Sequence, residues 1–433
     1  MSIFSQVQIT DSIEMIKIRD TYFDDTFKNK INLEQPMFTN ERGDVWRMPM
    51  VHLAEKVITF DDILNKACLP VLGLESFRDA ATKLLLGNES LALLEGRAFS
   101  AQVLSGTNGL RVAAEFLHKH LNYKTVYISS PSWRNYDYVF RSAKFENILY
   151  YSYWNISTRS LNIEAMLRDL RNARTPAVVV LQVCAHSPSS YDPTKAQWME
   201  IANVVKEKNL FPVLFSPFQG IASGDVDEDA WVVRYFVSNG FEFFCSQALG
   251  KNFAFCNERI GNLVCVTKNS DVITNLKSQL ALIITGLYSR PALHVASVVT
   301  YILNDPQLYD EWKENIKAMY LKCEKVRINL RQALEKLGTP GRWAHITQQR
   351  GMFANIGLTK EQIVYLMNTH HVYIRICGRI NLSAVNANNL DFVYIRICGR
   401  INLSAVNANN LDFLAKAICD TIKSVPANAP QCC

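Results

Sequence analysis

Lys251 and Arg259 are the residues of this chain whose types and spacing point most directly to chemistry. They stand eight residues apart in SQALGKNFAFCNERIGN, residues 246–262, directly after the largely apolar run 241–245. A lysine just past a buried strand is shielded from water, and this shielding favours its neutral form. A neutral lysine amine attacks carbonyl groups and can hold an aldehyde as a Schiff base. The spacing alone is weak support, because a structural lysine is the commoner explanation.

Ser105, Gly106 and Thr107 form a candidate anion site. A helix is expected from Asn108 to His120, so backbone N–H groups and the positive end of the helix dipole would face this tripeptide. On its own, Ser-Gly-Thr is an N-cap signature. Together with Arg259, whose guanidinium can bind a phosphate through two hydrogen bonds, it predicts a phosphate site.

Short runs rich in β-branched and aromatic residues alternate with helical patterns between about residues 95 and 270. The predicted strands are 125–129, 177–183, 211–216, 241–247 and 263–266, and the predicted helices are 108–120, 161–173, 195–209 and 227–239. This alternation predicts an α/β fold with a mostly parallel sheet. The strands are apolar on both faces, as expected if helices cover both sides.

A second, smaller α/β domain is expected after the sheet. Residues 306–337 predict one long helix, which Gly338-Thr-Pro-Gly ends. We therefore expect three parts: an N-terminal arm with part of the small domain (1–45), a large domain (46–305), and the long interdomain helix with the small domain (306–433).

Residues 372–392, VYIRICGRINLSAVNANNLDF, recur identically as residues 393–413. Perfect identity argues against an old structural repeat, and two copies are fewer than the three that a solenoid needs. A recent duplication or an error in the gene model explains the identity better. A period of 21 residues cannot extend one strand, so one copy must be looped out or packed irregularly.

Bulk properties exclude several classes of protein. The net charge of +6 is spread along 433 residues without a dense basic run, which argues against nucleic-acid binding. The longest apolar stretch, 280–287, is too short to span a bilayer, and the N-terminus does not resemble a secretory signal. The 11 cysteines lack framework spacing and favour free thiols in a reducing compartment. Cys184 and His186 have no second pair with which to bind a metal, so no metal is expected.

The lysine segment resembles SQSFSKNFGLYNERVGN, the corresponding segment of aspartate aminotransferases. Further blocks resemble this family from about Ala54 to the C-terminal helix: LSGTNGLRVAAEFL (104–117), YISSPSW (127–133), DPTKAQW (192–198), AWVVRYFVSNGFE (230–242) and GRINLSAV (378–385). The resemblance implies the type I fold of aminotransferases that depend on pyridoxal 5'-phosphate. It implies a cytoplasmic homodimer that transfers amino groups between L-aspartate or glutamate and 2-oxo acids (2-oxoglutarate and oxaloacetate).

The resemblance also implies a role for individual residues. Lys251 matches the Schiff-base lysine, and Arg259 matches the phosphate arginine beside Ser105, Gly106 and Thr107. Trp133 matches the aromatic residue that stacks on the cofactor ring, although a core tryptophan would be the commoner reading of it alone. Either Arg379 or its duplicate Arg400 matches the arginine that binds the substrate's α-carboxylate.

Several positions depart from the family pattern. Phe215 stands in place of the aspartate that pairs with the ring nitrogen. Phe218 replaces a tyrosine and Ser187 replaces an asparagine; in the family, that tyrosine and that asparagine contact the cofactor's phenolic oxygen. Thr285 aligns with the arginine that binds the side-chain carboxylate across the dimer. Cys68 and Ala248 replace a tyrosine and a serine near the phosphate.

These departures concern the activity that the resemblance implies. Loss of the charged partner weakens the cofactor as an electron sink, so aspartate transamination is expected to be weak or altered in specificity. Two alternatives stay open. One is a catalytically degenerate homologue that acts as a binding or dimer-partner protein, and the other is a different reaction of the same cofactor on another amino acid.

Overall fold

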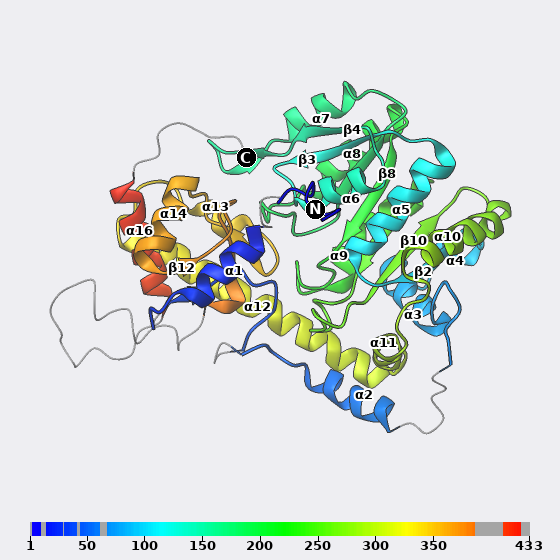
Figure 1. The fold of residues 1–433 in the computed structure, drawn as a ribbon, viewed down its shortest axis with the longest axis horizontal. Helices are drawn as coiled ribbons and strands as arrows, with labels where there is room; N and C mark the ends of the chain where they lie inside the picture. The colour runs from blue at the N-terminus through cyan, green and yellow to red at the C-terminus, as the bar shows by residue number, and fades with distance from the viewer. Residues whose placement is uncertain are drawn as a thin grey trace.

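The structure is a computed structural model, and it describes residues 2–9, 14–28, 30–40, 44–60, 67–385 and 410–425. A central sheet with helices on both faces forms the larger part of the molecule, and a smaller group of helices and short strands lies beside it (Figure 1). In the described parts of the chain, no helix has both the length and the apolar character that crossing a membrane requires.

The central sheet has seven strands in the order β2-β10-β9-β8-β7-β3-β4. Their bounds are β2 Ala98–Val103, β3 Thr125–Ser130, β4 Asn147–Ser152, β7 Val178–Gln182, β8 Phe211–Ser216, β9 Phe243–Ala248 and β10 Gly261–Val266. Strand β10 runs antiparallel to both β2 and β9, whereas the other neighbouring pairs are parallel. The predicted mostly parallel sheet is therefore confirmed.

Side chains alternate between the two faces along each central strand, as strand geometry requires. In β8, Val213 and Phe215 pack into one apolar cluster with helices α5 (Gly106–Leu121), α6 (Asn135–Ser142) and α10 (Ile273–Tyr288). Leu214 packs into the other cluster with α7 (Ile163–Arg171), α8 (Lys195–Glu207) and α9 (Val226–Ser238). Both faces are covered, which explains why these strands are continuous apolar runs.

Polar side chains fix where these helices begin. Ser105 accepts a hydrogen bond from the amide of Asn108 and so caps α5. Thr194 and Gln197 form a capping box at the start of α8, and Asp225 accepts from the amides of Asp227 and Glu228 at the start of α9. The start of α5 matters most, because it fixes the first amides of that helix at the edge of the sheet.

The remaining elements cover the sheet or build the smaller group. Beside the sheet lie α2 Pro49–Thr59, α3 Glu75–Leu86, α4 Leu91–Leu94, α11 His294–Asn304, a 3₁₀ turn η1 Ser270–Val272, and the hairpin β5 Trp154–Asn155 with β6 Ser160–Leu161. The smaller group has α1 Glu14–Asp24, β1 Ile31–Asn32, α13 Ala344–Gln348, β11 Phe353–Asn355, α14 Lys360–His370, β12 Val372–Tyr373, β13 Arg379–Asn381, the turn η2 Leu382–Ala384 and α16 Asn410–Ser424.

The long helix α12, Pro306–Lys336, runs from the sheet side of the molecule to this smaller group (Figure 1). Parallel pairing of β1 with β12 brings the N-terminal segment into the smaller group, with Ile31 opposite Val372. These observations support the expected division into an N-terminal segment, a large part and a small part, which remains a proposal.

The two copies of the 21-residue repeat contribute differently to the described structure. The first copy supplies β12 and β13. The second copy lies outside the described residues up to residue 409, and α16 begins at Asn410, the counterpart of Asn389 in the first copy. The strands thus come from the first copy, and the start of the following helix comes from the second.

Most predicted elements of the sheet region are confirmed within one or two residues of their ends. Strands β2 and β4 are absent from the prediction. In β4, NILYYS, three of the six side chains are only partly buried and two are exposed, so this edge strand lacks the continuous apolar run of the central ones. The predicted helix 161–173 begins later, because Asn162 caps α7 through the amide of Ala165.

Candidate active site

The sheet gathers most of the predicted site residues at one edge. Ser105 follows β2, Trp133 follows β3, Ser187 follows β7 and Lys251 follows β9. Because these strands point in the same direction, their carboxyl ends lie together, where open α/β sheets bind ligands. Strand β10 runs the opposite way, so Arg259, just before its first residue, joins the same edge.

Lys251 lies in the turn after β9 and is only partly exposed. Burial lowers the pKa of its amine to about 8; Cys256 opposes this shift, whereas the positive charges of Arg379 and Arg259 add to it. Its Nζ lies 4.7 Å from the centre of the Phe218 ring. A much larger fraction of this amine is neutral near pH 7 than in an exposed lysine, as a nucleophilic lysine requires.

The start of α5 and Arg259 together form a site suited to an anion. Ser105, Thr107 and Arg259 line one cavity of about 730 Å³. Helix α5 has 16 residues, and its first amides have no acceptor within the helix. The backbone of Arg259 has φ +56°, and its Nη1 donates to the carbonyl of Cys256 at 3.1 Å, which ties the arginine to the lysine turn.

Trp133 and Phe215 form an aromatic stack at the same edge. Their rings are parallel within 5°, with centroids 5.3 Å apart. Tyr136 meets both rings edge-on, at 5.5 Å from Trp133 and 5.9 Å from Phe215. A methyl group placed on Gly106 would lie 2.7 Å from Phe215 Cε2 and 2.8 Å from the Cβ of Ala248. Phe215 therefore fills the space beside the first turn of α5, and only glycine fits opposite it.

Ser187 and Arg379 connect the sheet edge to the smaller group of elements. Arg379 is 8% exposed, and its Nη1 donates to Ser187 Oγ at 3.1 Å. Its guanidinium carbon lies 4.2 Å from the centre of the Phe353 ring, and Phe353 meets Phe218 edge-on at 6.0 Å. Its Nε is buried without a hydrogen-bond partner among the described residues. A buried guanidinium held by a hydroxyl and a ring is suited to bind a carboxylate.

Of the two candidate arginines, only Arg379 can be placed. It lies in β13, paired with β11 opposite Asn355. Arg400 lies outside the described residues.

The turn that carries Ser187 is held by a buried carboxylate. Asp192 accepts hydrogen bonds from the amides of Ala185 and His186, at 2.7 and 2.9 Å. Burial raises the pKa of Asp192, and these two amides and nearby arginines oppose the rise. Both ring nitrogens of His186 contact serine hydroxyls at 2.8 Å, so this histidine has a structural role.

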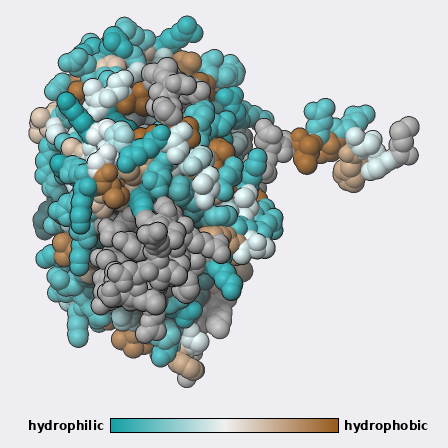
Figure 2. Space-filling view, turned by 90° about the vertical axis from the view of Figure 1, so that its left-hand side faces the viewer, coloured by the Kyte–Doolittle hydropathy of each residue, from teal (hydrophilic) through white to brown (hydrophobic). Residues whose placement is uncertain are grey.

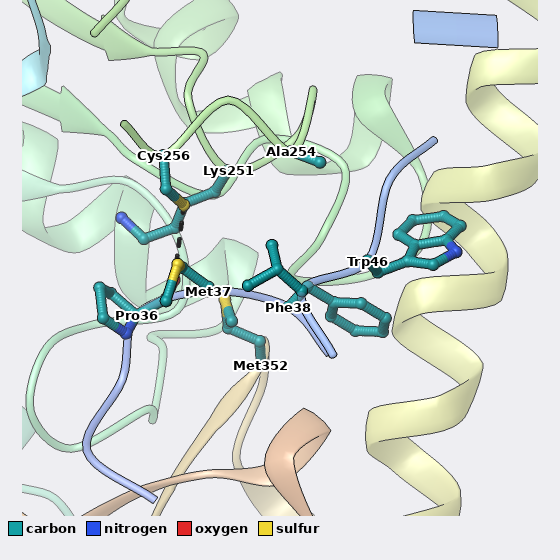
Figure 3. A pocket seen from close by; sticks show the side chains of 9 residues that line it. Pro36, Met37, Phe38, Trp46, Lys251, Ala254, Cys256 and Met352 are labelled. Carbon is teal, nitrogen blue, oxygen red and sulfur yellow. Dashed lines mark hydrogen bonds between the residues drawn. The ribbon is translucent and has the colours of Figure 1, made fainter. Parts of the chain in front are cut away.

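One loop of the site was missed from the sequence. Residues 33–39 cross between the lysine turn and β13, and Asn381 Nδ2 donates to the carbonyls of Gln35 and Met37 at 2.8 and 2.7 Å. Cys256 Sγ donates to the carbonyl of Pro36 at 3.7 Å. Figure 3 shows Pro36, Met37 and Met352 close to the turn that carries Lys251 and Cys256.

The sequence did contain a signal for the contact between Cys256 and this loop. Cys256 stands where the quoted family segment has a tyrosine, within the most similar block of the chain. The loop itself gave no such signal, because only the fold brings residue 36 beside residue 256.

Two further departures lie apart from this cluster. Thr285 is exposed on α10, and its hydroxyl donates within the helix to the carbonyl of Ala281 at 2.8 Å. Cys68 is exposed as well. Neither residue contacts the lysine, Arg379 or the anion site in any interaction found among the described residues.

Comparisons with known proteins agree with this geometry. The profile of the family "Aminotransferase class I and II" matches residues 28–418. The chain is 42% identical over 392 residues to the cytoplasmic aspartate aminotransferase of Caenorhabditis elegans, covering 90% of this chain and 96% of that protein. It is 41% identical over 396 residues to the cytoplasmic enzyme of Gallus gallus, with coverage of 90% and 96%.

Solved structures show the same fold. Aspartate aminotransferase from Saccharomyces cerevisiae cytoplasm superposes with a TM-score of 0.90 at 32% identity, covering 98% of this chain and 99% of that chain. An aromatic-amino-acid aminotransferase from Burkholderia pseudomallei, covalently bound to pyridoxal phosphate, superposes with a TM-score of 0.89 at 31% identity, covering 97% and 100%. The expected type I aminotransferase fold and the resemblance stated above are thus confirmed: the chain belongs to the class I and II aminotransferases and is similar over most of its length to aspartate aminotransferases.

Proposed function

We propose that this protein is an aminotransferase that holds pyridoxal 5'-phosphate on Lys251 and turns over slowly. The observation that carries the proposal is the position of Lys251. Arg259 is tied to its turn through the carbonyl of Cys256, and the lysine amine lies 4.7 Å from the ring of Phe218. The ring of Phe353 connects Phe218 to Arg379. One arginine belongs to the anion site at α5, and the other is suited to a substrate carboxylate.

A protein holds this cofactor at its phosphate, at its aldehyde carbon and at its ring nitrogen. The residues present fit the first two. Ser105, the amides of Gly106 and Thr107, and Arg259 would hold the phosphate. Lys251 would hold the aldehyde carbon. At the ring nitrogen, the apolar ring of Phe215 would stand in place of a charged group.

When bound, pyridoxal phosphate withdraws electrons from the α-carbon of an amino acid. The protein's own residues do the rest. Arg379 would bind the α-carboxylate and orient the substrate, and Trp133 would cover one face of the ring. Once its amine is released, Lys251 would accept the proton from the α-carbon and return it, because its pKa of about 8 lies near neutral pH.

Phe215 and Phe218 are the reasons to expect slow turnover. Neither ring offers a proton or a charge, and Ser187 keeps its hydroxyl but accepts from Arg379. A hydrogen bond to a charged group generally contributes about 1.5–3 kcal/mol, so losing one at the ring nitrogen would slow the reaction by roughly 10- to 150-fold. With Thr285 in place of an arginine, we expect no strong preference for dicarboxylates such as aspartate and glutamate.

We further propose that the chain works as a homodimer in the cytoplasm, as its cytoplasmic relatives suggest. Apolar side chains that a partner could cover are exposed on the N-terminal segment, on α2 and at the residue directly after α2. They are Ile3, Phe4, Val7, Ile9, Leu53, Val57 and Phe60. A segment with apolar side chains stands away from the body in Figure 2, and residues 2–9 are exposed throughout.

The experiment is a titration of the purified protein with pyridoxal phosphate. We expect visible absorbance from the covalently held cofactor, and a mass increase after borohydride reduction that maps to Lys251. The Lys251→Ala variant should show neither. A wild-type protein that shows neither at saturating cofactor contradicts the proposal.

A second candidate function rests on Phe215. Its packing against Gly106 and Trp133 resembles a filled core, as expected of a degenerate homologue that serves as a binding or dimer partner. The same titration separates the two, because this candidate requires no cofactor attachment. The third possibility, another reaction of the cofactor, would appear as attachment without amino-group transfer to 2-oxo acids.

A further inference from the structure

The hairpin of β5 and β6 leaves the sheet at the edge where the site lies. It follows β4, which runs parallel to β3 and so ends at the same edge. Asn155 Oδ1 accepts hydrogen bonds from the amides of Ser157 and Thr158, at 3.0 and 3.1 Å, and these fix the tip of the hairpin. Arg159 comes next, with a left-handed φ of +51°, so the backbone sets the direction in which its side chain leaves the hairpin.

Arg159 reaches from this hairpin to the smaller group of elements. Its Nη1 donates to the carbonyl of Arg342 at 3.2 Å, and its Nη2 donates to the carbonyl of Gly357 at 3.5 Å. The guanidinium carbon lies 5.1 Å from the centre of the Trp343 ring, within the range of a cation–π contact. A methyl group placed on Gly357 would lie 2.9 Å from Arg159 Nε, so the arginine packs directly on this glycine.

Gly357 is tied to the strand pair that carries Arg379. Asn355, the last residue of β11, pairs opposite Arg379 in β13, and its Oδ1 accepts from the amide of Gly357 at 2.9 Å. The amide of Ile356 donates to the carbonyl of Gly378 at 3.1 Å, directly before Arg379. Gly357 therefore cannot shift without moving the strand pair, and Arg379 moves with it.

The charge of Arg159 has no counterion in the described structure, where both of its hydrogen-bond acceptors are carbonyl groups. Burial lowers the pKa of its guanidinium. His345 is 4% exposed, and burial together with the positive charge of Arg159 lowers the pKa of His345 to about 4. An apolar side chain would pack on Trp343 without the cost of desolvating a charge, but two carbonyl groups could not aim it. The arginine therefore fixes a direction of approach and not only a contact.

We infer that Arg159 is a positioning residue: by holding Gly357, it keeps Arg379 in place at the edge of the sheet, beside Ser187. This role rests on the proposed function, in which Arg379 binds the carboxylate of the substrate. Arg159 contacts Gly357 and not the substrate, so its effect passes through the pair of β11 and β13.

A second connection between the same two parts makes the effect a partial one. In the turn after β7, the carbonyl of Ser190 accepts from the amide of Arg350 at 2.6 Å, and Ser187 Oγ accepts from Arg379 at 3.1 Å. These contacts hold the strand pair from the β7 turn, whereas Arg159 holds it from the hairpin. Two ties from different segments fix orientation as well as position, and loss of one leaves the strand pair free to turn about the other.

Binding of a carboxylate that cannot react measures this role. The protein loaded with pyridoxal phosphate is titrated with 3-phenylpropionate by calorimetry. Arg159→Met keeps an unbranched stem against Trp343 and removes both donors. Its affinity should fall about 2- to 30-fold, the range expected for a residue that is coupled to a ligand through other residues. Unchanged affinity in Arg159→Met overturns the inference.

Arg342→Met is the matched control. It removes a neighbouring positive charge from an exposed side chain and keeps the carbonyl to which Arg159 donates. This variant should bind 3-phenylpropionate as tightly as the wild type. A loss equal to that of Arg159→Met would show that the net charge is responsible and would contradict the positioning role.

A double-mutant cycle separates positioning from a general loss of stability. In the Arg379→Gln background, Arg159→Met should cause no further loss of affinity, because the side chain that it positions is already gone. Losses that multiply in the double variant would show that Arg159 acts independently of Arg379, and the inference would fail. A purely structural role would lower the melting temperature without this non-additivity.

Failure of the proposed function gives a different result. Cofactor attachment is followed by absorbance, and the titrations and the cycle are repeated on protein without cofactor. No attachment together with the same non-additive loss refutes the enzyme and keeps the positioning role at a carboxylate site. Attachment with unchanged affinity in Arg159→Met refutes the positioning role alone. A wild type that binds no 3-phenylpropionate in either form leaves Arg379 without a ligand to be positioned for, which overturns the inference as well.

Should Arg159→Met not fold, Arg159→Gln is the second variant. Its amide keeps a polar group at this half-buried position, but its shorter side chain cannot donate to both carbonyl groups. The affinity should fall within the same range, again only when Arg379 is present. Wild-type affinity in this variant contradicts the positioning role.

Discussion

The indole of Trp133 lies flat against the phenyl ring of Phe215, with centroids 5.3 Å apart and an angle of 5° between the planes. Tyr136 closes the arrangement from the side, buried and with a hydroxyl that has no partner among the described residues. Burial raises the pKa of Tyr136 well above its usual range, so this hydroxyl stays neutral. Trp133, Tyr136 and Phe215 thus form an uncharged aromatic box. In the proposed function, this box faces the ring nitrogen of the cofactor.

Replacing Phe215 by aspartate should have opposite effects with and without cofactor. Without it, Phe215→Asp places a carboxylate in the box and should lower the free energy of unfolding by about 3–5 kcal/mol. With pyridoxal phosphate, the carboxylate gains a partner at the ring nitrogen, so the cofactor should raise the melting temperature more than in the wild type, and turnover should rise.

Thermal unfolding with and without cofactor, compared with Phe215→Leu, checks this prediction. The leucine variant keeps the box apolar and should lose stability without gaining any extra response to cofactor. A cofactor-induced shift of equal size in the aspartate variant and the wild type would count against the electrostatic argument.

Attachment of the cofactor to Lys251 should depend on pH with a midpoint near the pKa of about 8 that burial gives this amine. The neutral amine is the nucleophile, so the rate of attachment should rise as the pH increases toward 8 and level off above it. An exposed lysine would still be almost wholly protonated there. Stopped-flow absorbance over a pH series measures the midpoint.

The Arg379→Gln variant is the control for the cause of this shift. Removing a positive charge that lowers the pKa of Lys251 should move the midpoint upward. An unchanged midpoint would show that the charge of Arg379 does not contribute to the shift.

The two copies of the repeat should differ sharply in function. Arg379→Gln should weaken the binding of a monocarboxylate by about 10- to 150-fold, the loss expected for a hydrogen-bonded charge worth about 1.5–3 kcal/mol. Arg400→Gln should leave affinity unchanged, because Arg379 already occupies the site beside Ser187. Calorimetric titration with 3-phenylpropionate compares the variants. A loss in Arg400→Gln similar to that in Arg379→Gln would show that the copies share the role.

The sequence predicts the sheet edge well, because its residues lie in continuous blocks. Lys251 follows β9 and Arg259 precedes β10, two strands that the sequence predicts, and parallel strands must bring their carboxyl ends together. Ser105 was found instead from the start of its helix, because β2 was not predicted. The departure at Phe215 could also be read directly, since it lies in the strand itself.

What the sequence could not show depends on contacts between distant segments. The loop 33–39 reaches Lys251 only because Asn381 and Cys256 bind its carbonyls, and neither contact leaves a pattern along the chain. The stacking of Trp133 on Phe215 depends likewise on the register between β3, β7 and β8. The edge strand β4 was missed because propensity is weakest where a strand is half exposed. Strand β2, AFSAQV, is largely buried, but Ser100 and Gln102 interrupt its apolar residues.

The turn after Phe218 provides a last prediction, on stability. Asp229 is buried and accepts hydrogen bonds from the amides of Ala222 and Ser223 at 3.0 and 3.3 Å. Burial raises its pKa from 3.8 to about 7, although these hydrogen bonds oppose the rise. Between these two pKa values the folded chain binds a proton that the unfolded chain has released. The free energy of unfolding should therefore fall as the pH increases from about 4 to about 7, by up to about 1.4 kcal/mol per pH unit.

Asp229→Asn cannot ionise but keeps an oxygen for the two amides, so this component of the pH dependence should vanish in the variant. Urea unfolding over the same pH range measures it as the difference between variant and wild type. Asp271→Asn, at an exposed position, is the matched control and should keep the wild-type slope. If the wild type and Asp229→Asn show parallel pH profiles, the carboxyl group is ionised throughout the range, and the two amide hydrogen bonds outweigh the cost of burial.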